Sequence, residues 1–294
     1  MKRKNLFIYY IFIALIVIAY GCKSKADNNI VSSDGVKIYF DQMGDNDPTL
    51  IFIHGWSNNR TIWDAQMSYF SKKYRVIAVD LPGFGESENN RTKWNMKSFG
   101  EDIADIIRQL DIKQSILVGF SMGGPVVLEA ASKTPPDRVI GVVIVDALRN
   151  PDMKYPPQMI SYIDSVMMDL IMNPTKEKML SGGFIKKNPD ESYKRALNMF
   201  KDHSKIGWSE SLTDFFNWSN DSFTEVLKKT EVPLISINSD SEPTNVDGFR
   251  KFIPTYQAKI IPDVGHVIMW DNPEEFNRLL EESINTFVKK SKSD

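Results

Sequence analysis

The stretch SILVGFSMGGPVVLEAAS, residues 115–132, decides the fold of this chain. It begins as an apolar run of strand type, makes a glycine-rich turn and continues as helical sequence. The turn carries the pattern G-x-S-x-G, formed by Gly119, Ser121 and Gly123. A serine on so sharp a turn needs small neighbours two residues away, and the helix that follows directs its N-terminal amides at the serine oxygen. In another context the pentapeptide would indicate only a glycine-rich turn, but between a strand and a helix it predicts that Ser121 is a nucleophile.

Short apolar runs recur along the rest of the chain and alternate with helical sequence. Most runs are continuous rather than alternating, which is typical of strands that are buried on both faces of a parallel sheet. Residues 95–110 place their apolar side chains on one stripe of a helix, and residues 273–289 begin with proline at a helix start. The repetition predicts an α/β fold with a mostly parallel central sheet and helices on both faces. The expected strands are residues 36–40, 49–55, 74–80, 115–119, 139–146, 233–238 and 258–263.

Residues 150–230 interrupt this alternation. They contain no convincing strand and are rich in methionine and aromatic residues. The insertion is too long for a plain connection, so we expect a helical cap between two parts of the core, residues 30–149 and 231–294. Its apolar side chains can form a small core of their own, and they can also line a pocket for a lipid-like ligand.

The N-terminus differs from the rest of the chain. A basic start, Met1 to Lys4, precedes an apolar run from Leu6 to Tyr20. The run is shorter than the roughly 20 residues that a spanning helix needs, and it ends at a small residue. Residues 1–21 are therefore expected to be a signal peptide.

Cys22 follows this segment and is the only cysteine of the chain, which excludes an internal disulfide. The sequence AYGC resembles the lipobox of bacterial lipoproteins, in which the cysteine thiol is acylated and becomes the first residue. The resemblance implies a lipid-anchored linker at residues 22–29, and an exported, membrane-anchored lipoprotein of the bacterial cell envelope. An uncleaved anchor or an ordinary signal peptide is the alternative. On every reading, the folded body lies outside the cytoplasmic membrane.

Composition limits the partners that the chain is expected to have. Of its 294 residues, 42% are apolar and 25% are charged, which is ordinary for a globular protein. A net charge of −2 and a pI near 6.0 give no reason to expect nucleic acid as a partner. No HExxH, CxxC, P-loop or dinucleotide motif is present, so we expect no metal and no cofactor. The oligomeric state stays open.

A serine becomes a good nucleophile only when a base takes its proton. The chain has three histidines, so the candidates can be compared directly. His54 directly follows a strand far upstream of Ser121, and His203 lies among charged residues of the cap, where a surface position is expected. His266 stands in a short loop between an expected strand and the final helix. His266 is therefore the expected base.

Five short motifs, given at the end of this paragraph by residue number, resemble those of the α/β-hydrolase superfamily. The resemblance covers nearly the whole chain, from Val31 to the last helix. In that family, backbone N–H groups of the residues after HG and after the nucleophile form the oxyanion hole, which implies these roles for Trp56 and Met122. His54 then becomes a structural histidine. The serine distinguishes the chain from dehalogenases and epoxide hydrolases of this fold, which use aspartate. The motifs are HGW (54–56), DLPGFGES (80–87), GFSMGG (119–124), VIVDAL (143–148) and GH (265–266).

The resemblance also implies that an acid lies between the nucleophile and the histidine in the chain. Asp240 follows the strand at 233–238, which usually bears this acid, and is our prediction, although the local spacing departs from that of the family. Asp146, at the end of the strand before the cap, is the alternative acid. Glu242 ranks behind both, and Asp263 is expected to brace the loop of the histidine.

The function expected from these residues is hydrolysis of a carboxylic ester of a hydrophobic small molecule through an acyl-enzyme. Four other activities of the same fold stay open: proline-type aminopeptidase, C–C hydrolase, perhydrolase and acyltransferase. An aminopeptidase would need acidic groups in the cap to hold an amino terminus, and Asp202, Glu210 and Asp214 could provide them. A catalytically slow ligand-binding protein is the alternative from a different class.

Overall fold

The computed structural model of the protein describes residues 28–201 and 207–292. The expected signal peptide, Cys22, Asp202 and His203 lie outside these residues. None of the helices within the described ranges combines the length and the apolar character that crossing a membrane requires.

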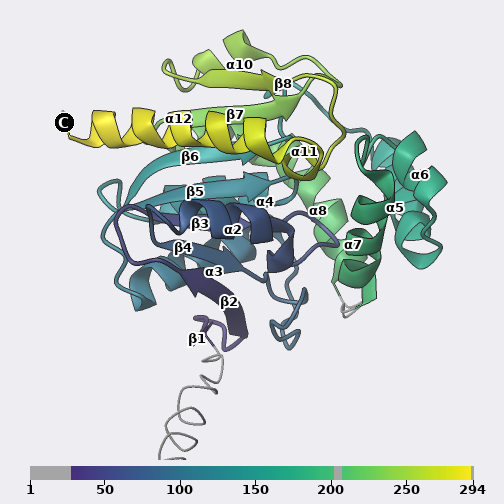
Figure 1. Ribbon diagram of the computed structural model, residues 1–294, viewed down its shortest axis with the longest axis horizontal. Coiled ribbons are helices and arrows are strands. Elements are labelled where there is room, and N and C mark those ends of the chain that lie inside the picture. The colour runs from purple at the N-terminus through teal and green to yellow at the C-terminus, as the bar shows by residue number, and fades with distance from the viewer. Residues whose placement is uncertain (1–27, 202–206, 293–294) are drawn as a thin grey trace, which may run out of the picture.

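An eight-stranded sheet forms the centre of the described structure (Figure 1). Its order is β1-β2-β4-β3-β5-β6-β7-β8, and the pairs from β4 to β8 are parallel, while β2 pairs antiparallel with both β1 and β4. This confirms the predicted α/β-hydrolase architecture. The strands are β1 (Asn29–Val31), β2 (Lys37–Met43), β3 (Thr49–Ile53), β4 (Val76–Val79), β5 (Ser115–Phe120), β6 (Val139–Val145), β7 (Leu234–Ser239) and β8 (Gln257–Ile261).

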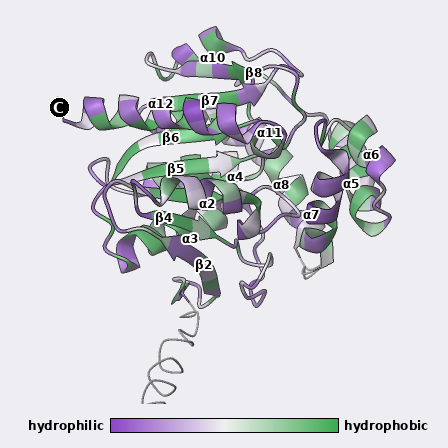
Figure 2. Ribbon diagram, in the orientation of Figure 1, coloured by the Kyte–Doolittle hydropathy of each residue, from purple (hydrophilic) through white to green (hydrophobic). Residues whose placement is uncertain are grey.

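Two apolar cores lie on opposite faces of the sheet. Successive strand residues alternate between them, so that Ile51 packs into one core and Phe52 into the other. Helices α3 (Met96–Gln109), α4 (Gly123–Lys133) and α9 (Phe223–Lys229) cover the first face, and α2 (Asp64–Phe70) and α12 (Pro273–Ser291) cover the second. The central strands are mainly hydrophobic along their length, as expected for strands between two helical layers (Figure 2).

Most of the helices between β6 and β7 stand beyond one end of the sheet, at the right of Figure 1. Trp208 and Trp218 of α8 attach them to the core: the Trp208 carbonyl accepts a hydrogen bond from the Trp56 indole, and the Trp218 indole donates to Glu129 of α4. These helices are α5 (Pro157–Met172), α6 (Lys176–Ser181), α7 (Pro189–Lys201) and α8 (Trp208–Asp221), whereas α9, which follows them, packs on the first face of the sheet.

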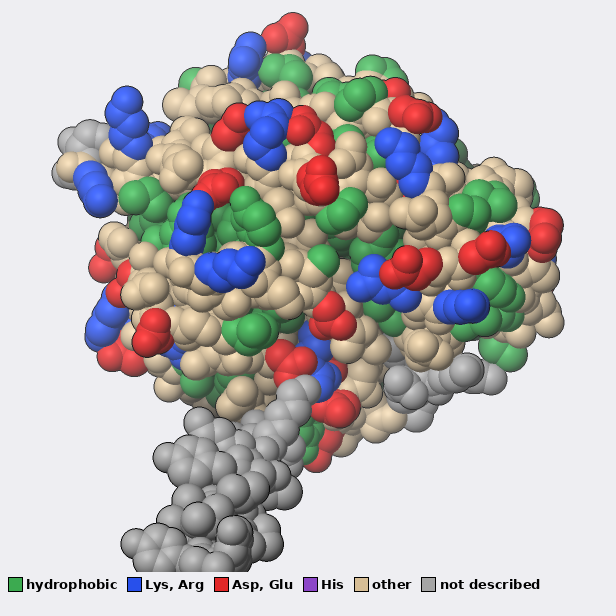
Figure 3. Space-filling view, viewed as in Figure 1, with side chains coloured by type: hydrophobic (Ala, Val, Ile, Leu, Met, Phe, Trp, Pro, Cys, Tyr) green, Lys and Arg blue, Asp and Glu red, His purple; other side chains and the backbone are tan. Residues whose placement is uncertain are grey.

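Short helical segments occupy several loops of the core. They are the 3-10 helix η1 (Arg60–Trp63), α10 (Val246–Arg250) and α11 (Ile268–Asp271). On the face shown in Figure 3, acidic and basic side chains are intermingled, in keeping with a net charge near zero.

Candidate active site

Ser121 lies on the turn between β5 and α4. Its φ of 51° is in the left-handed region, and its amide donates to the Val145 carbonyl at 3.0 Å. A Cβ atom on Gly119 would lie 2.1 Å from the Gly123 carbonyl oxygen, and one on Gly123 would lie 2.7 Å from the Ile53 carbonyl oxygen. The turn is therefore as crowded as the G-x-S-x-G pattern predicts, and it holds the serine at the carboxyl end of β5.

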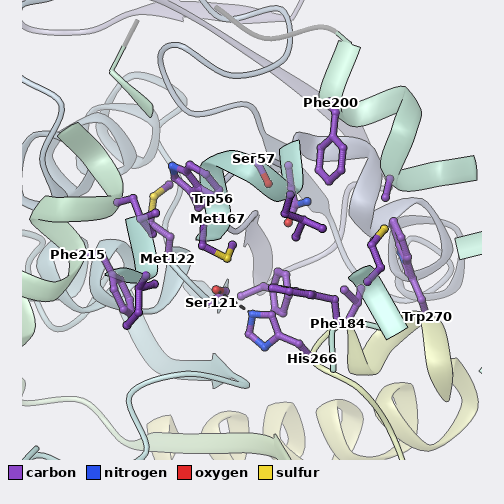
Figure 4. A pocket seen from close by; sticks show the side chains of 18 of the residues that line it. Trp56, Ser57, Ser121, Met122, Met167, Phe184, Phe200, Phe215, His266 and Trp270 are labelled. Carbon is purple, nitrogen blue, oxygen red and sulfur yellow. Dashed lines mark hydrogen bonds between the residues drawn. The ribbon is translucent and has the colours of Figure 1, made fainter. Parts of the chain in front are cut away.

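His266 lies against Ser121, as the sequence predicted. Its Nε2 is 3.0 Å from the Ser121 Oγ, and its ring packs on that of Phe120 with 4.8 Å between centroids (Figure 4). Backbone contacts hold the loop, because the His266 amide donates to the Gly183 carbonyl and the Gly265 amide donates to Asp271. The imidazole is thus placed to accept the serine proton.

The acid that meets this imidazole is Asp146. Its Oδ2 lies 2.7 Å from His266 Nδ1, and its Oδ1 accepts hydrogen bonds from the Ser239 amide and from Arg149, both at 2.6 Å. Burial favours the neutral acid, but the hydrogen bond and charge of His266, the charge of Arg149 and the Ser239 amide together hold the pKa of Asp146 below its ordinary value. The carboxylate therefore stays ionised beside the histidine.

The prediction that Asp240 holds the histidine is wrong, and the alternative acid Asp146 occupies that position. Asp240 is exposed beyond the end of β7 and accepts a hydrogen bond from the Asp263 amide at 3.2 Å. β6 pairs directly with β5, whereas β7 lies one strand further away. The guanidinium of Arg149 also donates to the Ser239 carbonyl and ties the end of β7 to Asp146.

The two residues expected to form the oxyanion hole line the same pocket as Ser121. Within the described ranges, neither the Trp56 amide nor the Met122 amide donates a backbone hydrogen bond. The Trp56 side chain is anchored separately, through its indole bond to Trp208. An oxyanion hole requires N–H groups without a backbone acceptor beside the nucleophile, and both residues meet that requirement.

An apolar cavity of about 210 Å³ opens above Ser121. It lies between the core and the cap, and we call it the apolar cavity. Aromatic and methionine side chains dominate its wall, so it suits a hydrophobic group (Figure 4). Its lining includes Met167, Leu170, Met179, Phe184, Phe200, Leu212, Phe215, Phe216 and Trp270.

His54 has the structural role that the resemblance implied. It is fully buried, and burial lowers its pKa to about 4, so the ring is neutral at pH 7. Its Nε2 accepts from the Leu81 amide at 3.0 Å, and its Nδ1 lies 2.7 Å from the Gly55 carbonyl oxygen. The ring therefore pins the loop that carries Trp56.

Of the three cap acids considered for an amino terminus, the two that the structure describes lie at another cavity. Glu210 and Asp214 border a separate cavity together with Lys93 and Trp94. The Met96 amide donates to the Asp214 carboxylate, which ties it to the start of α3. In the described part of the chain, no group of three or more His, Cys, Asp and Glu side chains could hold a metal ion.

Sequence reasoning missed three contributors to the site. Arg149 follows the acid by three residues in VIVDALRN, a spacing that could have suggested an ion pair. Asp271 binds the backbone of the histidine loop and of the cap at Lys186 and Lys187, and Phe184 of the cap accepts from the Val267 amide. Nothing in the sequence marks these last two, because they act on residues distant in the chain.

Comparisons with known proteins agree with this fold. A family model described as the alpha/beta hydrolase fold matches residues 48–273. A bifunctional esterase/perhydrolase of Acinetobacter calcoaceticus is 27% identical, over 85% of this chain and 96% of its own length. A non-heme chloroperoxidase of Kitasatospora aureofaciens is 26% identical, over 86% of this chain and 97% of its own. The solved structure of an esterase from Exiguobacterium antarcticum has the same fold, with a TM-score of 0.75 at 21% identity over 88% of this chain and 99% of that one.

Proposed function

Because the chain belongs to the alpha/beta hydrolase fold family and is a hydrolase enzyme of that fold, we propose that it is a serine hydrolase that cleaves a carboxylic ester of a hydrophobic small molecule. One observation carries the proposal. Ser121, His266 and Asp146 form a continuous line of hydrogen bonds, 3.0 Å and 2.7 Å long, and Ser121 and His266 line the apolar cavity.

Each group of this line has a defined part in acyl transfer. His266 removes the proton of Ser121 while the oxygen attacks the ester carbonyl, and Asp146 stabilises the imidazolium that results. The amides of Trp56 and Met122 stabilise the negative oxygen of the tetrahedral intermediate, where loss of one such donor costs about 3 kcal/mol in a well-studied protease. His266 then protonates the leaving alcohol and activates the water that releases the acid.

The wall of the apolar cavity supports an ester over a peptide substrate. An aminopeptidase holds the ammonium group of the acyl part of its substrate, and no described residue lining the apolar cavity is an aspartate or a glutamate. Glu210 and Asp214 lie at another cavity, and Asp202 is outside the described residues. The acyl-enzyme proposal therefore uses only side chains that the structure brings to Ser121.

Perhydrolysis is a second candidate, favoured by the similarity to the Acinetobacter esterase/perhydrolase. Hydrogen peroxide would replace water in attacking the acyl-enzyme, the acyl–Oγ bond would break, and a peracid would leave while His266 returns the proton to Ser121. Peracid formation from acetate ester and peroxide, measured beside ester hydrolysis, tests this candidate.

An activated aryl ester tests the main proposal. A burst of chromophore followed by steady turnover is expected, and Ser121→Ala should abolish both. A fluorophosphonate probe should label the unchanged protein and leave Ser121→Ala unlabelled. Labelling without turnover would instead indicate a slow ligand-binding protein, and absence of labelling would refute the assignment of the nucleophile.

We also propose that the enzyme is an exported lipoprotein anchored to a membrane through Cys22. The basic start, the apolar run and the sequence AYGC support this. Cys22→Ser should abolish labelling by a fatty-acid analogue and leave an unprocessed or soluble protein. Unchanged labelling and membrane attachment would contradict the proposal.

A further inference from the structure

A second cavity meets the apolar cavity at the catalytic residues. Its volume is about 630 Å³, and Ser121, His266, Phe184 and Phe215 line both cavities. We call it the polar cavity, because charged, hydroxyl and amide side chains form much of its wall. These include Asp146, Arg149, Asn150, Tyr155, Ser241 and Glu242.

The charge available to a ligand in the polar cavity is negative. Arg149 is nearly buried and its cation is paired with Asp146. The two terminal nitrogens of its guanidinium also donate to Ser239, to Ser241 and to the backbone carbonyl of Glu242. The pair is neutral as a whole, which leaves the Glu242 carboxylate as the unbalanced charge of the wall.

Tyr155 lies near enough to Glu242 for the charge of that carboxylate to act on its hydroxyl. Burial raises the pKa of the Tyr155 hydroxyl, and the negative charge of Glu242 raises it further. Tyr155 therefore stays a neutral hydroxyl that can donate a hydrogen bond, and its ring packs at 4.9 Å against Phe216. A carboxylate beside a phenol suits hydroxyl or ammonium groups and opposes anions.

The course of the reaction indicates that the acyl half of the ester lies in the apolar cavity and the alcohol half in the polar cavity. The oxyanion donors Trp56 and Met122 line the apolar cavity but not the polar one. After the alcohol leaves, water must reach the position that the alcohol oxygen held beside His266. The wider polar cavity can supply that water, while the acyl group stays in the apolar cavity.

We therefore propose that the natural substrate is an ester of an apolar acyl group with a polar alcohol that carries no negative charge, an inference that rests on the proposed serine hydrolase function. The ester C–O bond breaks as the acyl–Oγ bond to Ser121 forms, and the serine proton passes through His266 to the alcohol oxygen. The apolar cavity holds about seven water-sized groups at about 30 Å³ each, which fits a medium-length acyl chain.

Esters with a common acyl chain test the alcohol half. We expect kcat/KM to be higher for hexanoylcholine and glyceryl monohexanoate than for 3,3-dimethylbutyl hexanoate, and lowest for the hexanoyl ester of glycolate. The hexyl ester of betaine, which exchanges the polar and apolar halves, should be poorer than hexanoylcholine. Equal or faster cleavage of the dimethylbutyl, glycolate or betaine ester would overturn the inference.

Glu242→Gln tests whether the Glu242 carboxylate favours a cationic alcohol in the polar cavity. The ratio of kcat/KM for hexanoylcholine over its isostere 3,3-dimethylbutyl hexanoate should fall about threefold, as for an exposed ion pair. Glu210→Gln removes a cap carboxylate at the separate cavity and should leave the ratio unchanged. An unchanged ratio in Glu242→Gln, or an equal fall in both variants, would overturn the inference.

Hydrolysis of p-nitrophenyl hexanoate and labelling by a fluorophosphonate distinguish a failure of the polar-cavity assignment from a failure of the serine hydrolase proposal. Aryl-ester turnover with no preference among the alcohols would overturn only the assignment of the polar cavity. Absence of both turnover and labelling would overturn the serine hydrolase proposal and this inference with it.

Discussion

Replacing Asp146 with asparagine tests the hydrogen bond between the Asp146 Oδ2 atom and the His266 Nδ1 atom. The Oδ1 position accepts from the Ser239 amide and from Arg149, both at 2.6 Å, and these donors require an oxygen there. The amide nitrogen of the asparagine must then face His266. Its N–H group forces Nδ1 of the imidazole to accept, so the ring proton moves to Nε2, where the serine proton must be received.

The expected cost follows from this tautomer. The equivalent replacement in a well-studied serine protease lowers kcat about 10⁴-fold through the same change of tautomer. That factor corresponds to about 5 kcal/mol of transition-state stabilisation. Asp146 is buried and bonded at both oxygens, so water cannot substitute for the carboxylate.

The assay is kcat and KM with p-nitrophenyl hexanoate, with thermal unfolding as a check that the variant folds. Asp240→Asn is the matched control, because Asp240 is exposed and binds one amide at 3.2 Å; its kcat should stay within about twofold. A folded Asp146→Asn enzyme with nearly full activity, or a large loss in Asp240→Asn, would refute the reasoning.

Further changes test other parts of the structure. Arg149→Met removes a charged hydrogen bond from the buried acid and should lower kcat about 10- to 100-fold, with partial recovery in Arg149→Lys; equal activity of both variants and the parent would contradict this. Met167→Trp should shift the preferred acyl chain to shorter p-nitrophenyl esters by filling the apolar cavity, and an unmoved preference would place the acyl group elsewhere. Burial lowers the pKa of His54 from 6.5 to about 4, so the unfolded chain binds more protons between these values, and the free energy of unfolding should fall by up to about 3 kcal/mol as the pH drops from 6.5 to 4. Urea unfolding across this range should show a smaller fall in His54→Asn, and an identical fall would assign the pH dependence to other groups.

The nucleophile and the base could be identified from the sequence because each depends on local information. The crowding around Gly119 and Gly123 arises within a few residues of Ser121, so the pattern that encodes the turn is contiguous. His266 was found by comparing three candidates with the order of strands and helices. The α/β architecture likewise follows from continuous apolar runs, although the short edge strand β1 was not expected.

The acid could not be chosen from the sequence, because Asp146 and Asp240 both follow apolar strands and both lie between Ser121 and His266 in the chain. Only the tertiary structure decides between them. Strand order puts the end of β6 beside the nucleophile, and the φ of 48° at Asp146 is part of a turn that directs the carboxylate to His266.

The α/β architecture, the serine and the histidine could thus be predicted from sequence alone, since apolar runs, the turn of the nucleophile and the choice among three histidines can all be judged along the chain. The tertiary structure decided the acid and the division of the site into an apolar and a polar cavity. Both depend on contacts between segments far apart in sequence, such as Arg149 with the end of β7 and Gly183 with His266. Hydrophobic periodicity predicts which elements form, but the packing of distant elements sets which side chains meet.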